Sequence, residues 1–179
     1  MWTTQEEADT IIIQQVSQII AGTVLVVAND TNVFLFLLYY CNRGDITCKV
    51  LMTSHIEGRF FLDIKASVET HKQVIPGLLA AHALTGCDTV PSPHGIGKMT
   101  ALKVLRSQKC GLNQVGLVQH GQPLTIAAKK QSLAFVLACY GQESCRSLTE
   151  AVGNFLFSFH KMLVTGYTCR PLIGRWGVT

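Results

Sequence analysis

The sequence predicts an α/β fold, a sandwich built on a largely parallel sheet. Helical patterns and short apolar runs alternate up to about residue 64, which is typical of strands joined by helices. The run Val24-Leu25-Val26-Val27-Ala28 is continuously apolar, as expected of a strand buried on both faces. The chain has 179 residues, 48% of them hydrophobic, enough for one domain with a substantial core.

The first half is expected to contain three strands and four helices. A helix from about Gln5 to Ala21 comes first, with a capping box made by Thr3 or Thr4 and Glu6 or Glu7. The elements that follow are the strand at 24–28, a turn at 29–32, a buried helix at 33–42, strands at 48–53 and 60–64, and helices at 66–72 and 75–84.

The second half is expected to be helical. The apolar spacing predicts helices at 98–106, 112–118, 124–140 and 148–163. From 164 to 179 periodicity is lost among glycines and a proline, which predicts a disordered tail. The expected organisation is therefore an α/β core over 1–90, a helical part over 91–163, and the tail.

Composition and charge limit the classes of protein to which the chain can belong. A net charge of +4 is compatible with nucleic acid but does not require it. The seven cysteines are irregularly spaced and include no Cys-x-x-Cys, which indicates reduced, intracellular thiols. The start of the chain lacks the features of a signal peptide. The longest apolar run, Val33 to Cys41, is about half of the ~20 residues that a membrane-spanning helix needs, so no membrane association is expected.

A glycine-rich stretch from Leu84 to Lys98 carries the strongest functional signal. Its first part, Gly86-Cys87-Asp88, puts a carboxylate beside a residue without a side chain. Its second part, Gly95-Ile96-Gly97-Lys98, opens a helix whose unpaired N–H groups and dipole favour a phosphate. Lys98 and Lys103 add positive charge suited to a nucleic-acid backbone.

This stretch resembles the helix–hairpin–helix region of the flap endonuclease family, the structure-specific 5′ nucleases of DNA repair and replication. In that family a Gly-x-Asp carboxylate binds metal and a Gly-hydrophobic-Gly turn grips duplex phosphates. Glu7-Ala8-Asp9 is similar to the family's Glu-Ala-Glu at a helix start, and Asp30-Thr31-Asn32 to its Asp-x-Asp after the next strand. The resemblance covers roughly residues 4 to 110, with a weaker helical continuation to about 163.

The resemblance implies an incomplete PIN-like three-layer sandwich followed by a helix–hairpin–helix, and a metal-dependent nuclease acting on branched or flapped DNA in the nucleus. It implies catalysis by two divalent cations, Mg²⁺ or Mn²⁺. The residues that it assigns are the catalytic acids Glu7, Asp9, Asp30 and Asp88, the same four with Asn32 as metal ligands, and Gly95, Ile96, Gly97, Lys98 and Lys103 for nucleic acid.

The match to the family is partial. Asn32 stands where the family has an aspartate, so the second cation is expected to bind weakly. The family's N-terminal strand, two further aspartates and the arch that threads a flap have no counterpart here. We therefore expect a partial copy with impaired activity.

Physical spacing supports part of this site and leaves alternatives open. On extended backbone Asp30 and Asn32 point the same way, and strand ends of open α/β sheets are common ligand sites. Glu7 and Asp9 also suit a plain helix N-terminus, and Asp30 a plain turn. Two other hypotheses are a nucleic-acid-binding module without catalysis and a protein-interaction domain on the same scaffold.

Overall fold

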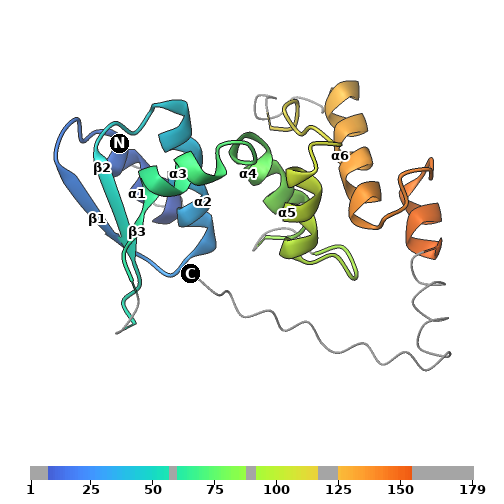
Figure 1. Ribbon diagram of the computed structural model, residues 1–179, viewed down its shortest axis with the longest axis horizontal. Coiled ribbons are helices and arrows are strands. Elements are labelled where there is room, and N and C mark those ends of the chain that lie inside the picture. Colours follow the sequence, from blue (N-terminus) through green and yellow to red (C-terminus); the bar gives the residue numbers. More distant parts are fainter. Residues whose placement is uncertain (1–7, 57–59, 88–91, 117–124, 155–179) are drawn as a thin grey trace.

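The computed structural model describes residues 8–56, 60–87, 92–116 and 125–154. These residues form an elongated molecule with a small sheet at one end and a group of helices at the other (Figure 1). The elements in chain order are α1 (Ala8–Ser17), β1 (Thr23–Val27), α2 (Thr31–Arg43), β2 (Lys49–Thr53), β3 (Leu62–Asp63), α3 (Ile64–His71), α4 (Ile75–Leu84), α5 (Lys98–Arg106) and α6 (Ile126–Cys139). Residues 148–154 are also helical.

The sheet is mixed, with the order β1-β2-β3. β1 and β2 are parallel, with Leu25 opposite Leu51, because the chain returns between them through α2. β2 and β3 are antiparallel, with Met52 opposite Leu62. The expectation of a largely parallel sheet therefore holds for only one of the two pairings, since the short connection from β2 reverses the chain direction.

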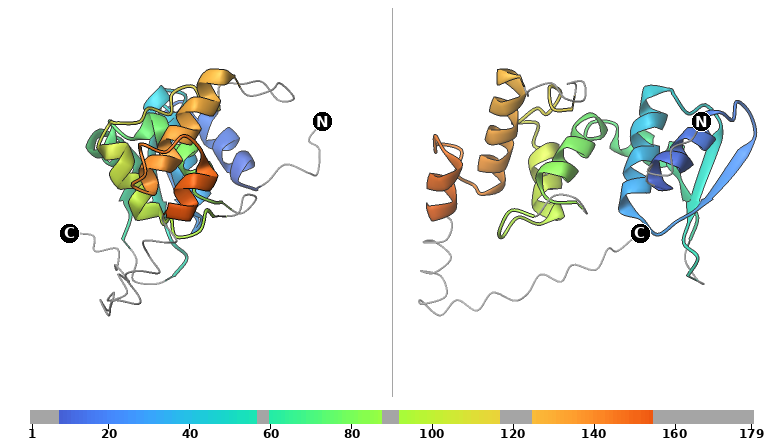
Figure 2. Two further views of the ribbon diagram at one scale, coloured as in Figure 1. Left: turned by 90° about the vertical axis from the view of Figure 1, so that its right-hand side faces the viewer. Right: turned by 180° about the vertical axis from the view of Figure 1, so that it is seen from behind.

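The helices beside the sheet cover only one of its faces (Figure 2). Val26, Val50 and Met52 are buried against α1, α2 and α3 in one hydrophobic cluster. On the opposite face Leu25 is 51% exposed and Val27 is 56% exposed. The prediction that the first strand is buried on both faces is therefore wrong. Among the described residues there are two layers, sheet and helices, instead of the three expected.

Side-chain caps shift two helix starts from their predicted positions. Asp30 is the N-cap of α2, and its Oδ1 accepts a hydrogen bond from the Asn32 N–H at 2.7 Å. α2 therefore begins at Thr31, inside the segment expected to be a turn. Asp63 caps α3 in the same way, accepting from the Ala66 N–H at 3.0 Å. This cap ends the predicted strand at residue 63 and starts the helix two residues early.

The first helix is shorter than expected at its C-terminal end. It stops at Ser17 instead of continuing to Ala21. The Ser17 hydroxyl donates to the Gln14 carbonyl at 2.8 Å, and the following N–H groups bond to carbonyls three residues back. Such local bonds compete with the helical pattern and end it. The expected capping box at residues 3–7 lies outside the described residues.

The helices after residue 74 build a second hydrophobic cluster. Phe135, Leu105 and Ala81 are buried in it, and Leu78 of α4 packs against both clusters. α6 matches the helix predicted at 124–140, and the Thr125 hydroxyl caps it by accepting from the Ala128 N–H at 3.1 Å. Of the helix expected at 148–163, residues 148–154 are helical and the rest lies outside the described residues.

The prediction of a helix at 112–118 is wrong for the residues of this range that the structure describes. Residues 113–116 form a turn, and 117–118 lie outside the described residues. The Gln131 side chain of α6 holds this turn, accepting from the Gln114 N–H at 2.9 Å and donating to Asn113 Oδ1 at 2.6 Å. These tertiary bonds replace the helical ones. The expected tail at 164–179 and the boundary near residue 90 also fall outside the described residues.

None of the helices in the described residues is both long enough and apolar enough to span a lipid bilayer.

Burial of Cys139 in the second cluster gives a pH-dependent stability. Burial, assisted by nearby Cys110, raises the pKa of the Cys139 thiol from 9.0 to about 11. Between these values the unfolded chain releases a proton that the folded chain keeps, so stability falls as pH rises. We expect Cys139→Ala to show a smaller fall than the wild type between pH 9 and 11 in urea titrations. Equal falls in both proteins would contradict this assignment.

Candidate functional site

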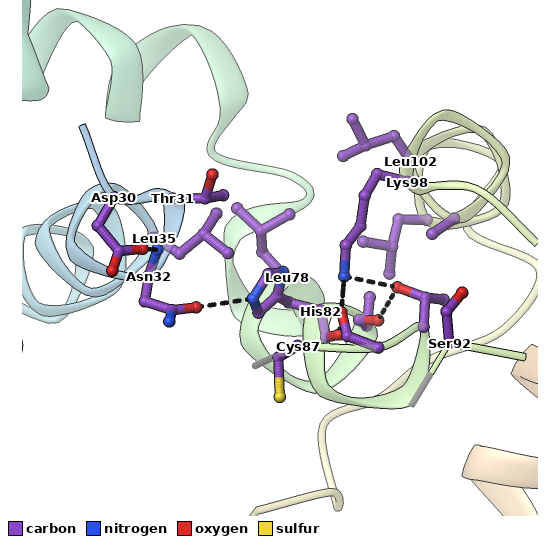
Figure 3. Close-up of a pocket in the computed structure, with 15 residues that line it drawn as sticks. Asp30, Thr31, Asn32, Leu35, Leu78, His82, Cys87, Ser92, Lys98 and Leu102 are labelled. Atoms are coloured by element: carbon purple, nitrogen blue, oxygen red, sulfur yellow. Dashed lines mark hydrogen bonds between the residues drawn. The ribbon is translucent and has the colours of Figure 1, made fainter. Parts of the chain in front are cut away.

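A cavity of about 620 Å³ lies between the N-terminal end of α2, the C-terminal half of α4 and the start of α5 (Figure 3). Its floor is apolar and its rim is polar. The lining residues are Asp30, Thr31, Asn32, Leu35, Leu78, Ala81, His82, Thr85, Gly86, Cys87, Ser92, Lys98, Ala101, Leu102 and Leu105. Segments far apart in the chain therefore meet here.

Asp30 and Asn32 both line this cavity, but not for the predicted reason. They were expected to share one side of an extended segment. Instead Asp30 is the extended N-cap, with φ −81° and ψ 131°, and Asn32 is in the first turn of α2. The cap bond from the Asn32 N–H holds the Asp30 carboxylate at the helix N-terminus, where the dipole stabilises its negative charge.

His82 connects α4 to α2 across the cavity and was missed from the sequence. Its Nε2 lies 2.8 Å from Asn32 Oδ1 (Figure 3). Because the Asn32 oxygen only accepts, Nε2 is the protonated ring nitrogen in this bond. The available signal was a polar residue inside an otherwise apolar helical run, ahead of Gly86-Cys87-Asp88 in the chain. The bond fixes the direction of the Asn32 carboxamide.

Gly86 sets the course of the chain as it leaves α4. Its φ is +95°, and a Cβ built there would lie 2.7–2.8 Å from backbone and side-chain atoms of Ser92. Only glycine accepts both this conformation and this close approach. The next residue, Cys87, lines the cavity. Asp88 follows Cys87 directly and lies outside the described residues.

Lys98 reaches back from the start of α5 to the end of α4. Its ammonium donates to the His82 carbonyl at 3.1 Å, to the Thr85 hydroxyl at 3.3 Å and to the Gly86 carbonyl. Burial lowers the pKa of Lys98, and the neighbouring Cys87 partly offsets this effect. The ammonium thus binds the last carbonyls of α4, where a cation is favoured.

The predicted glycine turn is present before α5. Gly95 has φ +77°, and Gly97 is the N-cap of α5 with no side-chain cap bond. Ile96 is buried in the second cluster and anchors the turn. Lys103 is exposed on α5. The backbone of the turn is therefore the part suited to a phosphate, together with the exposed lysine.

Two of the four predicted acids can be placed. Asp30 lines the cavity, while Asp9 is partly exposed on α1 and does not. Glu7 and Asp88 lie outside the described residues. Within the described ranges no three His, Cys, Asp or Glu side chains are grouped closely enough to hold a metal ion. Of the predicted site residues that the structure describes, Asp30 and Asn32 therefore line the same cavity, and Asp9 does not.

The cavity rim carries oxygen donors of the kind that hard cations prefer. Asp30 offers carboxylate oxygen and Asn32 amide oxygen, both of which suit Mg²⁺. Mg²⁺ sites commonly use one or two carboxylates together with phosphate and water oxygens. A cation held by only these two side chains would complete its coordination with phosphate and water oxygens. No family model, curated protein or solved structure matches the chain.

Proposed function

We propose that the protein is a nuclease-like DNA-binding protein whose cavity receives a backbone phosphate together with one divalent cation, Mg²⁺ or Mn²⁺. The observation that carries this proposal is the meeting of Asp30, Asn32 and Cys87 at one cavity. Asp88 directly follows Cys87, so a second carboxylate comes from the same segment. Hydrolysis of the phosphodiester is proposed to be weak, because Asn32 contributes no charge.

Each residue at the rim has a separate role in this proposal. Asp30 and Asp88 would hold the cation, which supplies positive charge that polarises a phosphodiester and a water molecule. His82 fixes the Asn32 carboxamide so that it remains at the rim. Lys98 is a positioning residue, because its bonds to the end of α4 hold the start of the Cys87–Asp88 segment.

The charge of Asp30 is tested by Asp30→Asn, which keeps a good helix cap and removes the carboxylate. We expect it to lose most of the Mn²⁺-dependent gain in affinity for a flapped duplex, a loss on the order of tenfold. Fluorescence anisotropy with Mn²⁺ and with EDTA measures it. The matched control is Asp45→Asn, because Asp45 pairs with Arg43 at 3.0 Å at the far end of α2. Equal affinities for Asp30→Asn and Asp45→Asn would contradict the proposal.

Adding a negative charge at position 32 is expected to change the affinity for the cation in the opposite direction, upward. Asn32→Asp keeps an oxygen that accepts from His82 and adds a negative charge at the rim. We expect Mn²⁺ affinity to rise by about tenfold, and cleavage of flapped DNA to rise with it. Electron paramagnetic resonance measures the free Mn²⁺ in a titration. Unchanged Mn²⁺ affinity would show that position 32 does not face the cation.

A second candidate is a DNA-binding module that needs no metal. It is favoured by one observation, namely that Asp30 Oδ1 and Asn32 Oδ1 each already accept a hydrogen bond from the protein. In that case binding would depend on Lys103 and the glycine turn, fall steeply with salt, and be unaffected by EDTA. The comparison of Mn²⁺ with EDTA separates the two candidates.

A further inference from the structure

A second cavity of about 330 Å³ lies on the other side of the α2 N-terminus, beside the C-terminal ends of β1 and β2. Asp30 and Thr31 line both cavities, so the start of α2 separates them. The lining residues of the second cavity are Ala28, Asn29, Asp30, Thr31, Phe34, Met52, Thr53, Ser54, Phe60 and Leu62. A ligand in this cavity would therefore lie next to the proposed phosphate site.

Two aromatic rings and an apolar floor dominate the second cavity. Phe34 of α2 is partly buried, and Met52 of β2 is buried. Phe60 also lines the cavity, although it is 84% exposed. An exposed aromatic side chain at the mouth of a cavity buries most apolar surface when a flat apolar ligand stacks on it.

The polar groups of the rim offer both donors and acceptors. The Asn29 amide nitrogen lies 3.0 Å from His55 Nδ1 and donates to it, so the Asn29 carbonyl is the group left to accept from a ligand. Ser54 Oγ accepts from the Ile56 N–H at 3.0 Å, so its hydroxyl proton remains a donor. Thr53 adds a second hydroxyl. These groups match the edge of a heteroaromatic ring that carries donors and acceptors.

We infer that the second cavity binds the base of a nucleotide, with the ring against Phe60 and its edge at Asn29 and Ser54. The volume of 330 Å³ is at the small end for ligand pockets and suits one nucleotide base with its sugar. The inference rests on the proposed function in one respect, because the phosphate of the same nucleotide would lie at Asp30. The base comes either from an unpaired end of a DNA strand or from a free mononucleotide.

The fluorescent base 2-aminopurine distinguishes these two sources, because stacking quenches it. One arm uses 2-aminopurine riboside 5′-monophosphate, and the other a duplex with one unpaired 5′ 2-aminopurine. A blunt duplex and an overhang with an abasic unit complete the set. We expect quenching with the overhang duplex, and weaker binding of the abasic one. Quenching with the mononucleotide alone would support the cavity and assign it to free nucleotides.

Phe60→Ala tests the stacking partner, with Phe61→Ala as the matched control. Phe61 is the adjacent aromatic residue, 62% exposed, and does not line the cavity. Phe60→Ala is expected to weaken base-dependent binding by about 5- to 150-fold and to abolish quenching, while Phe60→Tyr restores both. Phe61→Ala is expected to behave as the wild type.

The outcomes separate this inference from the proposed function. The inference alone would be overturned by two results together. The wild type would bind the overhang duplex no more tightly than the blunt and abasic duplexes, and Phe60→Ala would bind the blunt and abasic duplexes as the wild type does. Binding of the mononucleotide without any binding of DNA would overturn the proposed function alone. Absence of binding to every probe would overturn both.

Discussion

Phe135→Ala is expected to lower the free energy of unfolding by about 3–5 kcal/mol. Phe135 is 0% exposed, and it is among the largest side chains that are fully buried. It lies in the cluster that joins α4, α5 and α6, where Leu112 and Val115, from the segment between α5 and α6, also pack. Truncation removes apolar contacts and leaves a cavity that the helices can only partly close. Urea titration followed by circular dichroism measures the change.

Ile126→Ala is the matched control for Phe135→Ala. Ile126 is on the same helix but is 74% exposed. Its truncation is expected to change stability by about 0.5 kcal/mol or less, as for other exposed positions. A similar loss in both variants would show that α6 does not pack with the face that buries Phe135.

Gly86→Ala is expected to have the second largest effect. The positive φ of +95° alone costs about 1–3 kcal/mol for a residue with a side chain. The new Cβ would also meet Ser92 atoms at 2.7–2.8 Å, so the backbone at residue 86 or at Ser92, both of which line the cavity, must shift. We expect lower stability, measured by urea titration, together with a loss of DNA affinity on the order of tenfold.

Gly22→Ala separates the two causes of this effect. Gly22 has nearly the same φ, +99°, but a Cβ there would meet nothing within 4 Å. It therefore carries the conformational cost without the close approach, and it lies outside both cavities. We expect Gly22→Ala to be the less destabilising variant and to bind DNA normally. Equal losses of DNA affinity would show that Gly86 does not shape the site.

Much of the helical structure follows from sequence pattern alone. The helices at 75–84 and 98–106 occur at the predicted residues, because apolar spacing and the glycine turn define both. The errors arise at the ends of helices and strands, where a single capping side chain determines at which residue a helix begins. Asp30 and Asp63 were expected in a turn and a strand, and both are helix caps. Capping depends on a few atoms and leaves little trace in hydrophobic periodicity.

The layer count and the site depend on tertiary contacts that the sequence does not state. The run of apolar residues in β1 looks the same whether one face is covered or two, and here Leu25 and Val27 are exposed. Asp30 and Asn32 line the same cavity, but the link from Asn32 to His82 depends on how α4 packs against α2. Lys98 likewise binds the end of α4 because α5 packs beside it.

We propose that the cavity beside the start of α2 holds a divalent cation. Nuclear magnetic resonance of the ¹⁵N-labelled protein titrated with Mn²⁺ tests it most directly, because the ion broadens signals only from nearby nuclei. We predict that the amide signals of residues 30–32 and 82–87 broaden first and that those of α6 stay sharp. Selective broadening elsewhere, or no selective broadening at all, would contradict the account.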